Sequence, residues 1–251
     1  MPEIDSASAP RLEWLAAEVR EIIPETKRVS SLVLDVPGWR GHLPGQHVSI
    51  RLTGEDGYQA LRLYSIASPP ETSQVVLTVE RIDDGEVSPY LVGELRPGDR
   101  FELRGPIGGY FVWTVASGGP LFLIGGGSGV APLMAMLRHR AAHASRVPTR
   151  LLYSSRSEAE IIYRDELAHL AANDDSLRII HTLTREHPAG WSGETRRIDR
   201  QMLADVGFAP EAKPQVFVCG SNGLVESAAQ HLIDLGHDPL AIRTERFGPT
   251  T

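Results

Sequence analysis

The segment from Leu121 to Pro132 combines an apolar run, a glycine-rich turn and a proline in a pattern that suits phosphate binding. Glycines leave the backbone open, so N–H groups at the start of a following helix can close around a phosphate. The dinucleotide fingerprint G-x-G-x-x-G/A is not met, because its last position is valine in one frame and proline in the other. Proline suits a first helical turn, where its missing N–H costs no hydrogen bond. A turn needed only for packing is the alternative to a phosphate site formed by Gly127, Ser128, Gly129 and Pro132.

The motif Arg62-Leu63-Tyr64-Ser65 could hold a flat heterocycle together with a phosphate. In an alternating strand Arg62 and Tyr64 share one face, so a guanidinium lies beside a ring that can stack on a heterocycle. The Ser65 hydroxyl could reach a ring nitrogen where the strand ends. The alternative is a tyrosine in a barrel core and an arginine on the surface.

Cys219 ends an apolar run and is followed directly by Gly220. If that run is a strand of an open α/β sheet, the thiol lies at the carboxyl edge, where such sheets bind ligands. We therefore interpret Cys219 as a pocket residue rather than a nucleophile. A small buried hydrophobe is the alternative.

Hydroxyl and guanidinium groups follow two expected strands of the C-terminal half, where the adenosine ribose of a dinucleotide would lie. Such groups suit a 2′-phosphate, and no acidic residue closes either strand as a ribose diol would favour. If this half binds a nicotinamide dinucleotide, these residues favour NADPH as the cofactor, and NADH stays possible. The residues are Ser155, Arg156, Thr184 and Arg185.

His139 and His143 lie four residues apart on an expected helix and could share a metal ion. The residues between them lack the glutamate of a metalloprotease helix, and the sequence offers no evident third ligand. We predict no metal site. Ser128 is not a nucleophile elbow either, since G-x-S-x-G would require glycine in place of Val130.

The composition is that of a folded globular protein, with 251 residues of which 41% are hydrophobic and 23% charged. The net charge of −7 argues against a nucleic-acid partner. The stretch from Gly105 to Leu137 has no charged residue, but its glycines and prolines make it a poor membrane helix. Because Met1 to Pro10 has no apolar signal-peptide core, we expect a cytoplasmic protein. A single cysteine cannot form an internal disulfide or supply the four thiolates of a [2Fe-2S] centre.

The type of secondary structure that the sequence predicts changes near Gly118. Before it, short alternating segments with tight turns predict an antiparallel β-barrel, interrupted by a short helix with Ser88 as N-cap. The expected strands are 17–23, 31–36, 47–52, 61–67, 74–81, 100–104 and 110–115.

After Gly118, apolar runs alternate with helical stretches, which indicates a parallel, Rossmann-like α/β sheet. The expected strands are 121–124, 150–154, 178–183, 215–219 and 241–245, and the expected helices are 132–144, 163–172, 198–206 and 224–235. We therefore predict two domains, residues 11–117 and 118–251.

Six short motifs occur in the order seen in the ferredoxin-NADP reductase superfamily, which the chain resembles from about Leu12 to its C-terminus. They are Arg62 to Ser65, Gly85 to Ser88, Gly105 to Gly108, Gly127 to Pro132, Cys219-Gly220 and Glu245-Arg246-Phe247. The resemblance implies an N-terminal FAD-binding barrel and a C-terminal NAD(P)-binding α/β domain.

By position, the resemblance implies that Tyr64 stacks on the isoalloxazine, that Arg62 holds the FAD pyrophosphate and that Ser65 bonds near flavin N5. The remaining cofactor-binding residues that it implies include Leu63, Gly85, Glu86, Val87, Ser88, Gly220 and Phe247. It also implies that Ser65, Cys219 and Glu245 surround the site of hydride transfer, with Glu245 able to pass protons. Gly248 to Thr251 follow Phe247 in place of a terminal tyrosine, so the sequence leaves open which aromatic ring covers the flavin.

The function implied by the resemblance is a reductase that passes a hydride from NAD(P)H to FAD and then single electrons to a separate redox protein. A ferredoxin, a metalloenzyme subunit or a haem protein would each serve as acceptor. Two alternatives stay open: a reductase of free flavin or other small acceptors, and an electron-transfer subunit with little activity alone.

Overall fold

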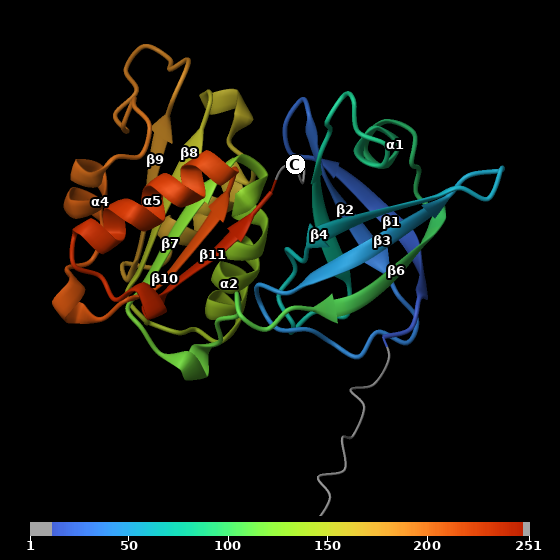
Figure 1. Cartoon of the computed structure of the whole chain (residues 1–251), viewed down its shortest axis with the longest axis horizontal. Coiled ribbons are helices and arrows are strands. Elements are labelled where there is room, and N and C mark those ends of the chain that lie inside the picture. Colours follow the sequence, from blue (N-terminus) through green and yellow to red (C-terminus); the bar gives the residue numbers. More distant parts are fainter. Residues whose placement is uncertain (1–11, 248–251) are drawn as a thin grey trace, which may run out of the picture.

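The computed structural model describes residues 12–247, which build two sheets that lie side by side (Figure 1). The first sheet has six antiparallel strands in the order β4-β3-β6-β1-β2-β5. An antiparallel bridge between Ile66, just after β4, and Leu77 on β5 links the two edges, so the sheet closes as the predicted barrel. Its strands are β1 (Leu15–Pro24), β2 (Val29–Asp35), β3 (His47–Thr53), β4 (Gln59–Ser65), β5 (Val75–Glu80) and β6 (Arg100–Ile107).

The short helix α1 (Ser88–Gly93) begins one residue earlier than its sequence suggests, because Val87 is the N-cap and Ser88 is the first helical residue. The Ser88 hydroxyl accepts a hydrogen bond from the backbone N–H of Ile82 at 3.0 Å and makes no cap bond within α1. The prediction of Ser88 as N-cap is therefore wrong. Its side chain joins the preceding loop to the helix.

The predicted strand 110–115 is also wrong, because this segment connects the two halves without pairing in either sheet. Phe111 and Trp113 are buried in the core of the C-terminal half. The rings of Phe111 and Phe217 pack edge-on, with their centroids 5.2 Å apart. The Trp113 indole N–H donates to the Gly118 carbonyl at 2.9 Å. The apolar alternation that resembled a strand serves this core instead.

The second sheet is parallel, as predicted, with the strand order β11-β10-β7-β8-β9. Its strands are β7 (Leu121–Gly126), β8 (Thr149–Ser155), β9 (Leu177–Leu183), β10 (Gln215–Gly220) and β11 (Ile242–Arg246). The helices are α2 (Val130–Ala142), α3 (Arg164–Ala172), α4 (Arg200–Val206) and α5 (Asn222–Asp234). Short 3₁₀ turns occur at Val115–Ser117, Gly127–Gly129, Glu158–Glu160, Pro210–Ala212 and Pro239–Ala241.

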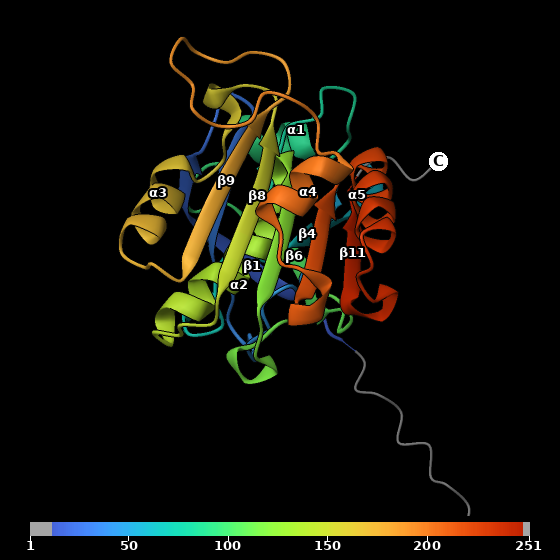
Figure 2. The same cartoon turned by 90° about the vertical axis from the view of Figure 1, so that its left-hand side faces the viewer.

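Helices cover both faces of the parallel sheet, with α4 and α5 on one face and α2 on the other (Figure 2). Side chains alternate along β7, so Phe122 and Ile124 pack toward α4 and α5 while Leu121 and Leu123 pack toward α2. Helix α2 lies between the sheet and the barrel (Figure 1), and ten of its residues are buried. Within residues 12–247 no helix is long and apolar enough to cross a membrane.

Candidate functional site

Three neighbouring strands bring Gly125, Cys219 and Glu245 into one row at the carboxyl end of the parallel sheet. In the strand register, Cys219 on β10 pairs with Gly125 on β7 and with Glu245 on β11. The carboxyl edge of an open α/β sheet is where such folds bind ligands. Two of the three predicted catalytic residues are therefore direct neighbours.

The barrel brings Ser65 to the same place, because the end of β4 faces the end of β11 across a small cavity of about 70 Å³. In the barrel sheet Ser65 is paired with His47 on β3. His47 Nδ1 lies 3.5 Å from Glu245 Oε1, so the two halves meet at this point. The cavity is lined by His47, Leu63, Tyr64, Ser65, Glu245, Arg246 and Phe247.

Two buried polar atoms of this cavity have no hydrogen-bond partner among the described residues, namely Ser65 Oγ and Glu245 Oε2. Burial raises the pKa of Glu245 to about 7 and lowers the pKa of His47 below its usual value. A buried polar atom without a partner is costly, so these two atoms indicate a polar ligand at this cavity. The carboxyl group can gain or lose a proton near neutral pH.

The Cys219 side chain is fully buried, and burial together with the nearby Glu245 raises the pKa of the thiol well above its ordinary value. A thiol nucleophile needs the opposite environment, one that stabilises the thiolate. The structure therefore argues against Cys219 as a nucleophile, and the thiol lines neither the small cavity nor the larger cavity of about 630 Å³.

In the motif on β4, Arg62 and Leu63 are exposed, and Arg62 lies beside the segment from Gly85 to Ser88. Arg62 Nη2 pairs with Glu86 Oε2 at 2.7 Å, and the Tyr58 hydroxyl donates to the other Glu86 oxygen at 3.0 Å. Tyr64 is half-buried, and burial raises its pKa to about 12, so its ring stays neutral. The structure thus brings together the two predicted segments for the flavin and its pyrophosphate.

Two positions of the glycine turn favour glycine, Gly129 because it lacks space for a side chain and Gly127 because of its backbone conformation. A Cβ on Gly129 would lie 2.3 Å from the Cys219 carbonyl oxygen, and Gly127 has a φ of +55°, which favours glycine. Pro132 is the third residue of α2, so it lies in the first helical turn as predicted. The Ser128 hydroxyl donates to Glu80 Oε2 of the barrel at 2.8 Å.

A second cavity, of about 630 Å³, lies between the barrel and the carboxyl edge of the parallel sheet. A cavity of this size suits a cofactor. Of the residues predicted for nucleotide binding it includes Gly127, Ser128, Ser155, Arg156, Thr184, Gly220 and Phe247. Arg185 does not line it, and its backbone N–H donates to the Arg156 carbonyl. Gly129 and Pro132 lie buried behind the turn.

The barrel contributes cavity residues that were not found from the sequence. Lys27, Arg28 and Glu80 line the large cavity, and His47 lines the small one. None belongs to a motif, and they reach the site through strand pairing and the docking of two halves. The available signal in the sequence was the presence of polar residues at the ends of the predicted barrel strands.

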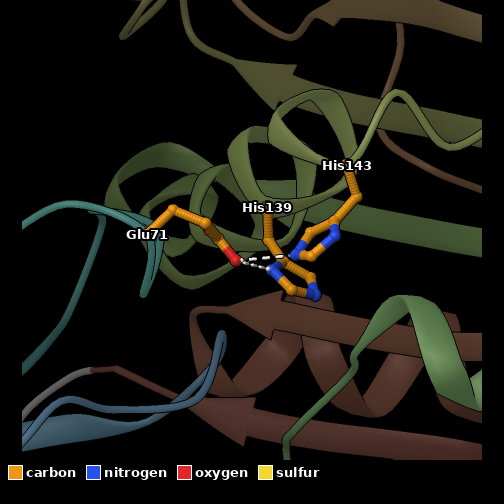
Figure 3. Close-up of side chains that lie close together, drawn as sticks. All are labelled: Glu71, His139 and His143. Carbon is orange, nitrogen blue, oxygen red and sulfur yellow. Dashed lines mark hydrogen bonds and ion pairs between the residues drawn. The ribbon is translucent and has the colours of Figure 1, made fainter.

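Glu71 on the loop before β5 approaches both His139 of α2 and His143, the residue that caps the C-terminus of α2 (Figure 3). Its Oε1 lies 2.7 Å from His139 Nδ1 and 2.9 Å from His143 Nε2. The backbone N–H of Val115 donates to His139 Nε2 at 3.2 Å, so the ring proton belongs on Nδ1, where it bonds Glu71. A metal ligand would need this nitrogen without its proton. We interpret the three residues as a hydrogen-bonded contact between barrel and α2.

Family models match both halves of the chain. The model described as an oxidoreductase FAD-binding domain matches residues 17–112, and the model described as an oxidoreductase NAD-binding domain matches residues 123–230. The first model therefore covers the barrel, and the second covers the glycine turn and Cys219.

Among related proteins, ferredoxin-NADP reductase B of Sorangium cellulosum is 36% identical over 212 residues, which cover 81% of this chain and 84% of that protein. The reductase component of propane 2-monooxygenase from Mycolicibacterium smegmatis is 28% identical, covering 88% of this chain and 64% of that protein. The FAD/NAD-binding domain of a nitric oxide dioxygenase from Vibrio cholerae has a TM-score of 0.83 at 27% identity, covering 94% of this chain and 99% of that one.

The chain spans less than two thirds of the length of several relatives, the propane 2-monooxygenase reductase component among them. It nevertheless covers most of a bacterial ferredoxin-NADP reductase at 36% identity, and it joins an FAD-binding to an NAD-binding domain. The order of the two domains and their two sheets agree with the fold of that group. The chain therefore belongs to the ferredoxin-NADP reductase superfamily.

Proposed function

We propose that the chain is an FAD-dependent NAD(P)H oxidoreductase that passes a hydride from NAD(P)H to FAD and then single electrons to a separate redox protein. The observation that carries this proposal is that Ser65 and Glu245 line one cavity between the FAD-binding and NAD-binding domains, with Cys219 beside Glu245 on the neighbouring strand. When bound, FAD supplies the conversion of a two-electron donor into single electrons, and the protein supplies binding and orientation.

On the barrel side, Tyr64 offers a ring for stacking on the flavin, and the unpartnered Ser65 hydroxyl offers a hydrogen bond to its ring system. Arg62 would hold the pyrophosphate after exchanging its bond to Glu86 for one to phosphate. The Glu86 side chain links this guanidinium to the segment from Gly85 to Ser88, which is proposed to serve the same phosphates. Leu63 and Phe247, which line the small cavity, complete this half of the site.

On the α/β side, the large cavity is proposed to hold NAD(P)H. Its phosphates would lie at the glycine turn of Gly127, Ser128 and Gly129, ahead of Pro132 and α2. The exposed Arg156 would meet the 2′-phosphate of NADPH, with Ser155, Thr184 and Gly220 lining the cavity and Arg185 near its edge. We propose NADPH as the preferred donor, with NADH as a second one.

Glu245 is proposed to hold or release a proton at its carboxylate oxygens close to the site of hydride transfer. Its raised pKa of about 7 allows both protonation states at neutral pH. His47, whose pKa burial lowers, can accept a hydrogen bond from the protonated carboxyl at Nδ1. The Cys219 thiol is proposed as a neutral contact for the nicotinamide, because it is small and remains protonated.

The acceptor is proposed to be a protein. A monooxygenase reductase component and a ferredoxin-NADP reductase stand among the relatives, and a dioxygenase domain among the structural neighbours, which supports a ferredoxin, a metalloenzyme subunit or a haem protein as acceptor. The domain division 11–117 and 118–251, with residues 11 and 248–251 outside the described residues, stays part of the proposal, as does the predicted cytoplasmic location. The tail that follows Phe247, on which the covering ring depends, lies outside the described residues as well.

The test is an anaerobic titration of the purified protein with NADPH and with NADH. We expect a yellow protein that releases FAD on denaturation and whose flavin absorption is bleached by the nucleotide. A protein that cannot be reconstituted with FAD would contradict the proposal. Retention of FAD through purification argues against a free-flavin reductase, and rapid bleaching argues against an inactive subunit. A screen of one-electron acceptors then identifies the acceptor class.

A further inference from the structure

Glu80, the last residue of β5, reaches from the barrel to the glycine turn of the other half. Its Oε2 accepts a hydrogen bond from the Ser128 hydroxyl at 2.8 Å. A Cβ built on Gly127 would lie 3.9 Å from the same oxygen, so the carboxylate lies directly at the turn. Among the described residues, Glu80 forms no ion pair with a Lys, Arg or His. The turn therefore already has an anionic group beside it.

A phosphate and a carboxylate are both anionic hydrogen-bond acceptors, so both would compete for the same donors at this turn. The turn leads into the thirteen-residue helix α2, whose N-terminal N–H groups and dipole favour negative charge. Glu80, Gly127 and Ser128 line the same cavity of about 630 Å³. A dinucleotide phosphate that enters there meets a like charge at close range and competes for the Ser128 hydroxyl. Both effects reduce its affinity.

We propose that Glu80 is a determinant of nucleotide affinity that acts against binding, as an internal carboxylate in competition with the phosphates of NAD(P)H. The inference rests on the proposed function, since it assigns the large cavity to the dinucleotide. A carboxylate that a phosphate displaces from Ser128 could pair with Lys27, which lines the same cavity and has no ion pair among residues 12–247. Weaker binding favours release of the oxidised nucleotide after each hydride transfer.

The test is calorimetric titration of the FAD-loaded protein with NADP⁺, which binds without reducing the flavin. We expect Glu80→Gln, which keeps the size and a hydrogen-bond acceptor, to lower the Kd by about threefold or more at low ionic strength, because like-charge repulsion is removed. The control is Glu160→Gln, which removes a charge from the lining of the same cavity in the 3₁₀ turn that follows β8. Its effect should be smaller, because it does not contact Ser128.

Ionic strength separates repulsion from a structural effect. The ratio of the wild-type Kd to the Glu80→Gln Kd should fall when salt rises from about 0.05 M to about 0.5 M, since salt screens charge interactions. An unchanged Kd in Glu80→Gln overturns the proposal, as does an equal effect of Glu160→Gln. A weaker affinity also overturns it and would make Glu80 an acceptor for ribose hydroxyls. If wild-type protein binds neither NADP⁺ nor NAD⁺ and is reduced by neither NADPH nor NADH, the proposed function itself has failed.

Discussion

His47 Nδ1 lies 3.5 Å from Glu245 Oε1, and this pair joins the third strand of the barrel to the last strand of the α/β sheet. Burial raises the pKa of Glu245 to about 7 and lowers the pKa of His47. Both shifts favour the neutral forms, so the protonated carboxyl can lie beside the neutral imidazole without a buried charge, whereas transfer of the proton to His47 would leave a charge on each residue.

Glu245 is expected to make stability depend on pH. Its pKa is about 7 in the folded protein against an ordinary value of 4.5, so the folded state binds more protons between these pH values. Stability therefore falls as pH rises from about 4.5 to about 7, by up to about 3 kcal/mol for a fully realised shift, and changes little above. Urea unfolding at pH 5 and pH 8, at one FAD concentration, measures this. Glu245→Gln should remove this contribution to the dependence, and an equal slope in both proteins would contradict it.

Ser65→Ala should slow hydride transfer by about tenfold while FAD stays bound, because it removes one positioned hydrogen bond at the reaction site. Stopped-flow reduction by NADPH measures the rate, and the flavin spectrum measures retention. Ser49→Ala is the matched control, since Ser49 is a buried serine on the neighbouring strand outside the cavity. Equal rates in the wild type and Ser65→Ala would reject the proposed role.

Gly129→Ala should disrupt the glycine turn, because the new Cβ would lie 2.3 Å from the Cys219 carbonyl oxygen and cannot be relieved by a side-chain rotation. We expect a loss of about 2–4 kcal/mol of stability, the range typical of severe overpacking against backbone. Thermal unfolding at a fixed FAD concentration checks this. Gly109→Ala is the control, since a Cβ there has no neighbour within 4 Å. If both variants melt alike, the close approach at Gly129 is not required.

Arg156→Ala should raise the KM for NADPH about tenfold more than the KM for NADH, because Arg156 lines the large cavity and can pair with a 2′-phosphate. Arg185→Ala should change the two KM values more equally, since Arg185 does not line this cavity. Steady-state kinetics with both nucleotides measures the split. A larger effect of Arg185→Ala would move the 2′-phosphate site toward the end of β9.

The fold could be predicted from sequence where local chemistry decides it. The glycine turn and Pro132 mark the end of β7 and the first turn of α2, because few other residues tolerate these backbone positions. The prediction of segment 110–115 as a strand is wrong. Alternating apolar residues indicate that one side of a segment is buried, but they do not show that the segment pairs in a sheet. Phe111 and Trp113 are buried against another half of the chain.

The site could be predicted only in part. Ser65, Cys219 and Glu245 follow motifs, and the structure brings them to one place. His47 and Glu80 carry no motif, since their positions depend on strand register and on how the barrel docks against the sheet. Such residues become visible only when both halves are in place.

Helix α2 is covered by the barrel on one side and by the parallel sheet on the other. Met136 on α2 lies close to Gly45 of the barrel, Arg138 donates to the Ala67 carbonyl at 2.8 Å, and the opposite side packs on the sheet. A fragment cut at the connection between the halves would expose this apolar surface and lose its partners. The two halves are therefore poor modules for exchange between reductases, and a chimaera would have to carry α2 together with the barrel surface that covers it.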